Sequence, residues 1–117
     1  MNKRVLVVED DGLLALDIAN YLSDAGLEVV GPAASVTTAL KLVSKTGCDV
    51  AVLDVNLGSE NSGPVARELR ARGTPFVVLS GYSSEQHPSE FQGAPLLSKP
   101  ARPAELVALL RRCMGDA

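Results

Sequence analysis

Side chains that carry reactive oxygen or nitrogen atoms stand directly after four apolar segments of the sequence: Glu9-Asp10-Asp11, Asp54, Ser80 and Lys99. Carboxylates held close together without partners repel one another and lose their solvation. A hard cation such as Mg²⁺ relieves that conflict, because it takes one or two carboxylates as ligands and keeps several waters. If the fold brings these segments together, the residues predict a divalent-cation site with a hydroxyl and an ammonium beside it.

Five short apolar segments alternate with stretches of helical periodicity, which favours a parallel sheet covered by helices. The predicted strands span residues 4–9, 27–31, 49–54, 75–80 and 95–98. The predicted helices lie within residues 11–26, 35–47, 64–73 and from 103 onward, with Asp11 and Ser35 as N-caps of the first two. Residues 83–92 carry no apolar stripe, so a fourth helix there is expected to be short or irregular. Right-handed crossovers then predict an α/β fold with an open, doubly wound sheet.

Length, composition and charge narrow the classes of protein to consider. The 117 residues suit a single domain over residues 1–117, and 46% of them are hydrophobic but only 3% aromatic, as expected for an aliphatic core. A net charge of −3 argues against nucleic-acid binding through phosphate neutralisation. The first apolar run, residues 5–8, is too short for a signal-peptide core or a membrane span. We therefore expect a cytoplasmic protein.

Four short motifs carry a resemblance to a known family: Val7-Val8-Glu9-Asp10-Asp11, Val52-Leu53-Asp54, Leu79-Ser80-Gly81 and Ser98-Lys99-Pro100. In this order, each at the end of a predicted strand, they resemble the signature segments of response-regulator receivers over the whole chain. Each motif alone is weak, but the four together are specific. The resemblance implies a flavodoxin-like fold with five parallel strands in the order 2-1-3-4-5 and helices on both faces of the sheet.

The resemblance also assigns a Mg²⁺ site and a phosphoacceptor. It implies that Asp54 accepts the phosphoryl group and contributes to the metal site, that Asp10 binds the metal directly, and that Glu9 acts through a metal-bound water. The backbone carbonyl of Asn56, two residues after the acceptor, matches a further metal ligand. Asp11 is expected to serve only as a helix cap.

Two further residues are implied to contact the phosphoryl group. Ser80 matches the hydroxyl that turns toward the phosphoryl oxygens after transfer. Lys99 matches the ammonium that pairs first with the acceptor and then with the phosphoryl group, and its bond to Pro100 is cis in the family. Phosphoryl transfer requires mainly positioning and charge neutralisation, which a cation and a lysine can supply.

The sequence departs from the common receiver pattern in the second half of the chain. Leu96 stands where most receivers carry an aromatic residue that switches rotamer, so readout is expected to use residues 81–95 without that switch. Residues 75–82 partly match a subfamily of short standalone receivers whose fourth strand reads Pro-Phe-x-Phe-Ala-Thr-Gly, although Val78 and Leu79 replace Phe and Ala. His87, in a polar stretch, is expected to be a solvated loop residue, and the arginines at 67, 70 and 72 a solvated helix face.

Taken together, these features predict a standalone phosphoacceptor, monomeric or weakly dimeric, that acts by protein contact or as a phosphate sink. Its phosphodonor would be a histidine kinase or a histidine phosphotransfer protein, and it would catalyse only its own phosphorylation and dephosphorylation. A phosphorylation-independent pseudo-receiver of the same fold is the alternative, which retention of the site residues disfavours. An aspartyl phosphatase would need a second carboxylate two residues after Asp54, where Asn56 stands.

Overall fold

The computed structural model describes residues 2–81 and 89–115. Its main sheet contains five parallel strands in the spatial order β2-β1-β3-β6-β7. The strands are β1 (Arg4–Val8), β2 (Glu28–Ala33), β3 (Val50–Asp54), β6 (Phe76–Ser80) and β7 (Leu96–Ser98). Counted along the chain within this sheet, the order is 2-1-3-4-5, so the predicted doubly wound topology is confirmed.

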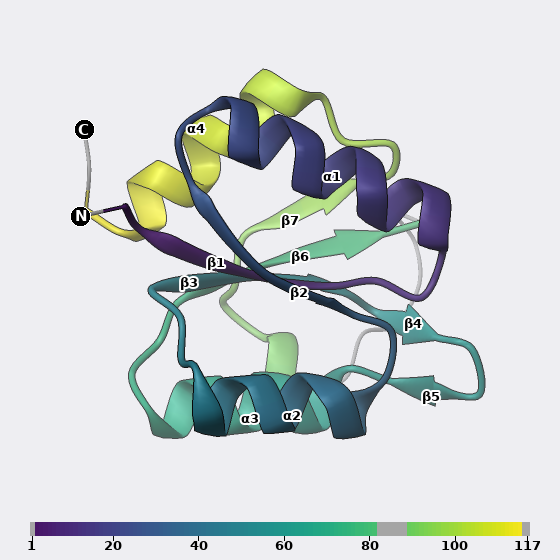
Figure 1. Ribbon diagram of the computed structural model, residues 1–117. Coiled ribbons are helices and arrows are strands. Elements are labelled where there is room, and N and C mark those ends of the chain that lie inside the picture. The colour runs from purple at the N-terminus through teal and green to yellow at the C-terminus, as the bar shows by residue number, and fades with distance from the viewer. Residues whose placement is uncertain (1, 82–88, 116–117) are drawn as a thin grey trace.

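Helices cover both faces of the sheet (Figure 1). α1 (Gly12–Asp24) and α4 (Pro103–Cys113) lie on one face, whereas α2 (Val36–Lys45) and α3 (Gly63–Ala71) lie on the other. Successive side chains of a strand point to opposite faces, so Val5 and Val7 join the core beneath α1 and α4, while Leu6 and Val8 join the core above α2 and α3. Burial on both faces explains why the central strands are continuous apolar runs. None of the described helices is long and apolar enough to cross a membrane.

Both predicted N-caps are confirmed. The Asp11 side chain accepts hydrogen bonds from the amides of Leu13 and Leu14, at 3.0 and 3.1 Å. The Ser35 hydroxyl accepts one from the amide of Thr38 at 3.2 Å. These bonds satisfy amides that have no partner within the first helical turn, and so fix where each helix begins after its strand.

Two boundaries differ from those predicted. β2 does not stop at Gly31-Pro32 but continues to Ala33, because its pairing with β1 shifts between Leu6 and Val8 and lets the Gly-Pro pair bulge at an edge strand. Between the predicted strand that ends at residue 54 and the predicted helix that starts at residue 64, where no strand was expected, the chain forms a small hairpin of β4 (Asn56–Leu57) and β5 (Glu60–Asn61) before α3 begins at Gly63.

The predicted irregular fourth helix and His87 fall largely on residues 82–88, which lie outside the described residues. The part that follows contains a short 3-10 helix, η1 (Ser89–Phe91), whose Phe91 is buried in the core. Arg70 of α3 holds this turn: it donates hydrogen bonds to the carbonyls of Glu90 (2.8 Å) and Gln92, and its guanidinium lies 5.1 Å from the centre of the Phe76 ring. Arg70 is exposed, as predicted for this helix face, but its contacts with this turn were not predicted.

Candidate functional site

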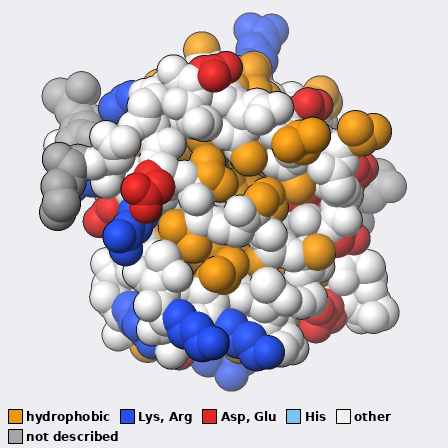
Figure 2. Space-filling view, viewed as in Figure 1, with side chains coloured by type: hydrophobic (Ala, Val, Ile, Leu, Met, Phe, Trp, Pro, Cys, Tyr) orange, Lys and Arg blue, Asp and Glu red, His pale blue; other side chains and the backbone are white. Residues whose placement is uncertain are grey.

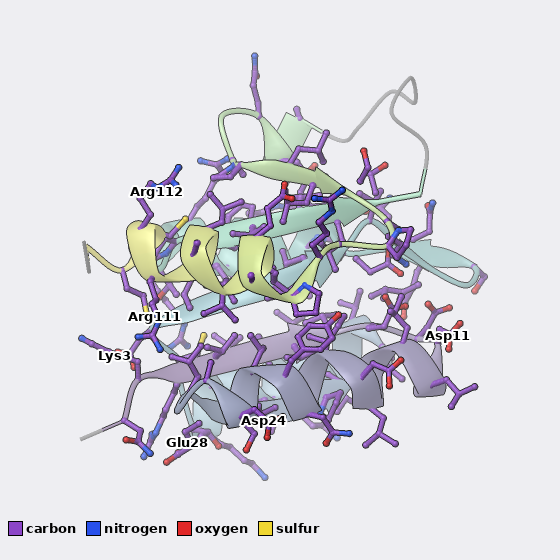
Figure 3. The ribbon with its side chains drawn as sticks, turned by 90° about the horizontal axis from the view of Figure 1, so that it is seen from above. Lys3, Asp11, Asp24, Glu28, Arg111 and Arg112 are labelled. Carbon is purple, nitrogen blue, oxygen red and sulfur yellow. The ribbon has the colours of Figure 1, made fainter. Side chains whose placement is uncertain are left out.

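The polar residues that end the strands meet at one edge of the sheet. Glu9 and Asp10 follow β1, Asp54 is the last residue of β3, and these two strands are neighbours in register, with Val8 beside Leu53. Carboxyl ends of parallel strands lie at the same edge, so the acidic pair faces Asp54 across the two strands. Figure 3 shows Asp11 at this end of α1, while Lys3, Glu28 and Arg111 lie at the opposite end of the molecule.

Lys99 joins the two buried carboxylates. Its Nζ lies 2.9 Å from Asp54 Oδ2 and 3.0 Å from Glu9 Oε1. The Lys99 amide donates to the carbonyl of Ser80 at 2.9 Å, which ties the end of β7 to the end of β6, and the Lys99–Pro100 peptide is cis as predicted. The Lys99 side chain is 23% exposed whereas the Asp54 side chain is 5% exposed, so the pair is shielded but open on one side.

A group of three carboxylates could hold a metal ion. One oxygen each of Glu9, Asp10 and Asp54 lie within 4.8 Å of one another. Asp10 is exposed and opens the group to solvent, whereas Glu9 and Asp54 are buried. Oxygen donors at this spacing are the ligands that a hard divalent cation prefers.

The hydrogen bonding of Glu9 is consistent with a divalent cation at this cluster. Its Oε2 accepts the Asp11 amide at 3.1 Å. Its Oε1 is fully buried, and no group among the described residues donates a hydrogen bond to it, although the Lys99 ammonium lies 3.0 Å away. The ion pair attracts this oxygen but leaves its hydrogen-bonding capacity unfilled, and a nearby metal-bound water could fill it. The residues present therefore fit a divalent cation.

The remaining predicted residues take different positions around this group. Ser80 ends β6 and its side chain is buried. It lies one residue beyond Leu79, the register partner of Asp54. Asn56 begins β4, its side chain is exposed, and its backbone pairs with Asn61 in the hairpin. The structure thus brings Glu9, Asp10, Asp54 and Lys99 into one cluster, with Ser80 and Asn56 on the adjoining ends of strands.

One buried polar residue at this edge was missed by the sequence analysis. Ser62 is 0% exposed, and its hydroxyl donates a hydrogen bond of 2.6 Å to the backbone carbonyl of Asp54. The signal that could have revealed it is a serine directly before Gly63-Pro64, the expected start of a helix, where a polar side chain must find a partner.

The surroundings of Glu9 and Lys99 shift their protonation. Burial, followed by the hydrogen bond and charge of Asp54, raises the pKa of Glu9 to about 7, against the lowering effects of the Asp11 amide and Lys99. Burial alone would lower the pKa of Lys99, but its contacts with Asp54 and Glu9 outweigh burial and raise it. Without a cation, Glu9 therefore holds a proton for a good part of the time at neutral pH, while Lys99 stays charged.

We expect the affinity for Mg²⁺ to increase with pH as Glu9 loses its proton. Below its pKa of about 7, the proton on Glu9 competes with the cation; above it, the carboxylate cluster is fully ionised and the affinity levels off. Between about pH 6 and pH 7 the dissociation constant should fall by about fivefold. Mg²⁺ titrations across this range would measure it. Glu9→Gln should flatten the profile, and a wild-type affinity that does not vary with pH would contradict the assignment.

Comparisons with known proteins agree with this geometry. Residues 5–111 match the family described as the response regulator receiver domain. The chain is similar to the transcriptional regulatory protein PdtaR of Mycobacterium tuberculosis H37Rv, with 33% identity over 82 residues that cover 69% of this chain and 40% of PdtaR. It is also similar to the regulatory protein VirG of Agrobacterium tumefaciens strain 15955, with 31% identity over 114 residues, or 93% of this chain and 42% of VirG. The chain spans about two fifths of the length of these curated relatives.

Solved structures share the whole fold. The solution structure of SdrG from Sphingomonas melonis Fr1 matches with a TM-score of 0.81 and 37% identity, covering 97% of this chain and 96% of SdrG. A CheY-like response regulator receiver domain from Methylobacillus flagellatus matches with a TM-score of 0.83 and 25% identity, covering 97% of this chain and 99% of that one. The similarity therefore extends through all the elements that surround the carboxylate cluster.

Proposed function

The chain belongs to the response regulator receiver family of two-component signalling, and on that premise we propose that it accepts a phosphoryl group on Asp54 from a phosphohistidine. The observation that carries this proposal is the position of Lys99, whose ammonium contacts both Asp54 and Glu9 within 3.0 Å beside a cluster of three carboxylates. A bare surface aspartate would have neither partner. The domain is proposed to comprise residues 1–117.

In the proposed reaction, an oxygen of the Asp54 carboxylate attacks phosphorus, and the bond between phosphorus and the donor's imidazole nitrogen breaks. Lys99 orients the carboxylate before transfer and offsets the charge of the phosphoryl oxygens afterwards. The hydroxyl of Ser80, the last residue of β6, is proposed to contact those oxygens. Glu9, Asp10, Asp54 and the Asn56 carbonyl would hold Mg²⁺, which when bound supplies further positive charge. Loss of the group by hydrolysis would complete the cycle, with no other substrate turned over.

The phosphodonor is proposed to be a histidine kinase or a histidine phosphotransfer protein that docks beside this edge of the sheet. Leu13 and Leu16, in the first half of α1, are 76% and 56% exposed. In Figure 2, hydrophobic side chains spread across the centre of the visible face and reach its upper right part, where α1 lies in Figure 1. An apolar surface next to the acceptor suits a protein donor that must bring its imidazole to Asp54.

The proposal is tested by phosphotransfer from a panel of autophosphorylated histidine kinases, with and without a chelator. Label should pass to the chain from at least one donor, and chelation of the divalent cation should stop the transfer. No transfer from any kinase or small-molecule phosphodonor would favour the pseudo-receiver, whereas label taken up without the cation would contradict the proposed cation site. The narrower resemblance of residues 75–82 to standalone receivers stays a prediction, and a panel that includes kinases partnered by such receivers would bear on it.

We expect phosphorylation to be read out between residues 81 and 95. Leu96 on β7 lacks an aromatic ring that could fill or vacate the space near Ser80, so the change must be carried by the backbone that follows β6. The far end of this stretch is anchored by Arg70, which holds the carbonyls of Glu90 and Gln92. Hydrogen exchange with and without fluoroberyllate should show changed protection mainly in residues 81–95. A response confined to α1 or α4 would contradict this route.

A further inference from the structure

Ser62 is a fully buried serine between the β4–β5 hairpin and α3. Its side chain and its backbone both donate to the chain at the end of β3: the hydroxyl donates to the carbonyl of Asp54 at 2.6 Å, and the amide donates to the carbonyl of Val55 at 3.1 Å. These two hydrogen bonds join the residue after the β4–β5 hairpin to the residues before it, at the end of β3.

This hydroxyl forgoes the role that its position favours. Ser62 is the N-cap residue of α3, where serine ordinarily accepts a hydrogen bond from an amide of the first turn. Here the side chain makes no capping bond, and the Asn61 side chain instead accepts the Gly63 amide at 2.8 Å. The Ser62 hydroxyl therefore does not cap α3, and instead donates to the backbone of Asp54, the proposed phosphoryl acceptor.

The contact controls the position of two groups that the proposed chemistry needs. The carboxylate and the carbonyl of Asp54 belong to one residue, so fixing the carbonyl limits rotation of the backbone that carries the carboxylate. The hairpin that starts two residues later carries Asn56, and its turn passes beside the cluster, since a Cβ at Gly58 would lie 3.8 Å from Asp10 Oδ2. A loosened end of β3 would displace both sides of the cation site.

We infer that Ser62 is a positioning residue for the Asp54 site, and that its hydroxyl holds the acceptor and the β4–β5 hairpin in the geometry that binds a divalent cation. This inference rests on the proposed function, because the cation and the phosphoryl group are what the geometry would serve. It assigns Ser62 no contact with the phosphoryl group itself. Its effect should therefore appear first in cation binding, before any phosphodonor is added.

Ser62→Ala should weaken Mg²⁺ binding about fivefold, the factor expected for one lost hydrogen bond. The rate of labelling by acetyl phosphate at saturating Mg²⁺ should fall by about tenfold or more, because the acceptor is less well oriented. The measurements are Mg²⁺ titration, hydrogen exchange at the amides of residues 55 and 62, and initial labelling rates. Both amides should exchange faster in the variant.

Ser35→Ala is the matched control, because it also removes a serine hydroxyl at a helix N-cap, but on α2, where that hydroxyl bonds Thr38 and not the backbone of Asp54. It should lower stability and leave the Mg²⁺ affinity and the amides at 55 and 62 unchanged. Equal Mg²⁺ affinity in Ser62→Ala and Ser35→Ala would overturn the inference. If Ser62→Ala does not fold, Ser62→Cys replaces it; its thiol is a weak donor, so wild-type affinity in that variant would also overturn the inference.

These readouts separate the inference from the proposed function. If the wild-type chain takes up no phosphoryl group, the proposed function fails, while cation binding and amide exchange still decide the role of Ser62. If the wild type is labelled and Ser62→Ala behaves as the wild type in all three measurements, the inference fails and the proposed function stands.

Discussion

Asp54→Asn is expected to give a folded protein that takes up no phosphoryl label. Asparagine has nearly the same shape as aspartate and keeps the end of β3 filled, but its amide is not a nucleophile toward phosphorus. Lys99 would keep its ion pair with Glu9. Because the hydrogen bond and the charge of Asp54 both raise the pKa of Glu9, that pKa should fall in the variant. A thermal melt shows whether the variant is folded, and incubation with a phosphohistidine donor shows whether it takes up label.

The matched control is Asp49→Asn, which makes the same change at the other end of β3. Asp49 accepts the Arg4 amide at 2.7 Å, far from the carboxylate cluster. This variant should lose some stability and still be labelled at the wild-type level. Label that persists in Asp54→Asn would move the acceptor to another residue.

Asp10→Asn is expected to weaken Mg²⁺ binding by more than about tenfold, and more than Glu9→Gln does at neutral pH. Asp10 is the exposed carboxylate of the cluster and is expected to contact the cation directly. Glu9 is buried, is held by Lys99 and the Asp11 amide, and with a pKa of about 7 is already partly protonated. Removing its charge therefore changes less at pH 7. Mg²⁺ titration of the two variants at one pH makes the comparison.

Asp11→Asn controls for the general loss of negative charge near the site. Asparagine is as good an N-cap as aspartate, so the bonds to the Leu13 and Leu14 amides can be kept. Only long-range attraction is lost, and the affinity should fall far less than in Asp10→Asn. Equal losses in Asp10→Asn and Glu9→Gln would mean that the two acids share the cation differently.

The parts of the fold that could be predicted are those in which one local pattern determines the outcome. The apolar runs of β1, β3 and β6 are buried on both faces, so periodicity and length suffice to recognise them. Asp11 and Ser35 cap helices through contacts within a few residues of themselves. The strand order required the family resemblance, since periodicity does not specify which strands are neighbours.

The parts that were missed depend on contacts between distant segments. β2 continues past Gly31-Pro32 only because a shift in its pairing with β1 accommodates the bulge. Arg70 has the sequence context of a solvated helix residue, yet it binds carbonyls about twenty residues away and stacks on Phe76. Neither partner is visible from the periodicity of α3.

In the candidate site, too, the residues set by a local pattern were predicted and those set by distant contacts were missed. Glu9, Asp10, Asp54 and Lys99 were predicted because each follows a strand that is easily recognised, and the structure places them together. Ser62 was not, because the rule for serine before a helix predicts a cap, whereas its hydroxyl reaches back eight residues to Asp54. The shifted pKa of Glu9 likewise depends on burial that only the packed sheet creates.

The most direct test of the central claim is to locate the phosphoryl group on the wild-type chain. The protein would be treated with acetyl phosphate and Mg²⁺, the acyl phosphate reduced with hydride, and the peptides mapped by mass spectrometry. We predict a single modified residue, Asp54, whose modification disappears when the cation is chelated. Modification at any other residue, or none at all in a folded protein that binds Mg²⁺, would contradict the account.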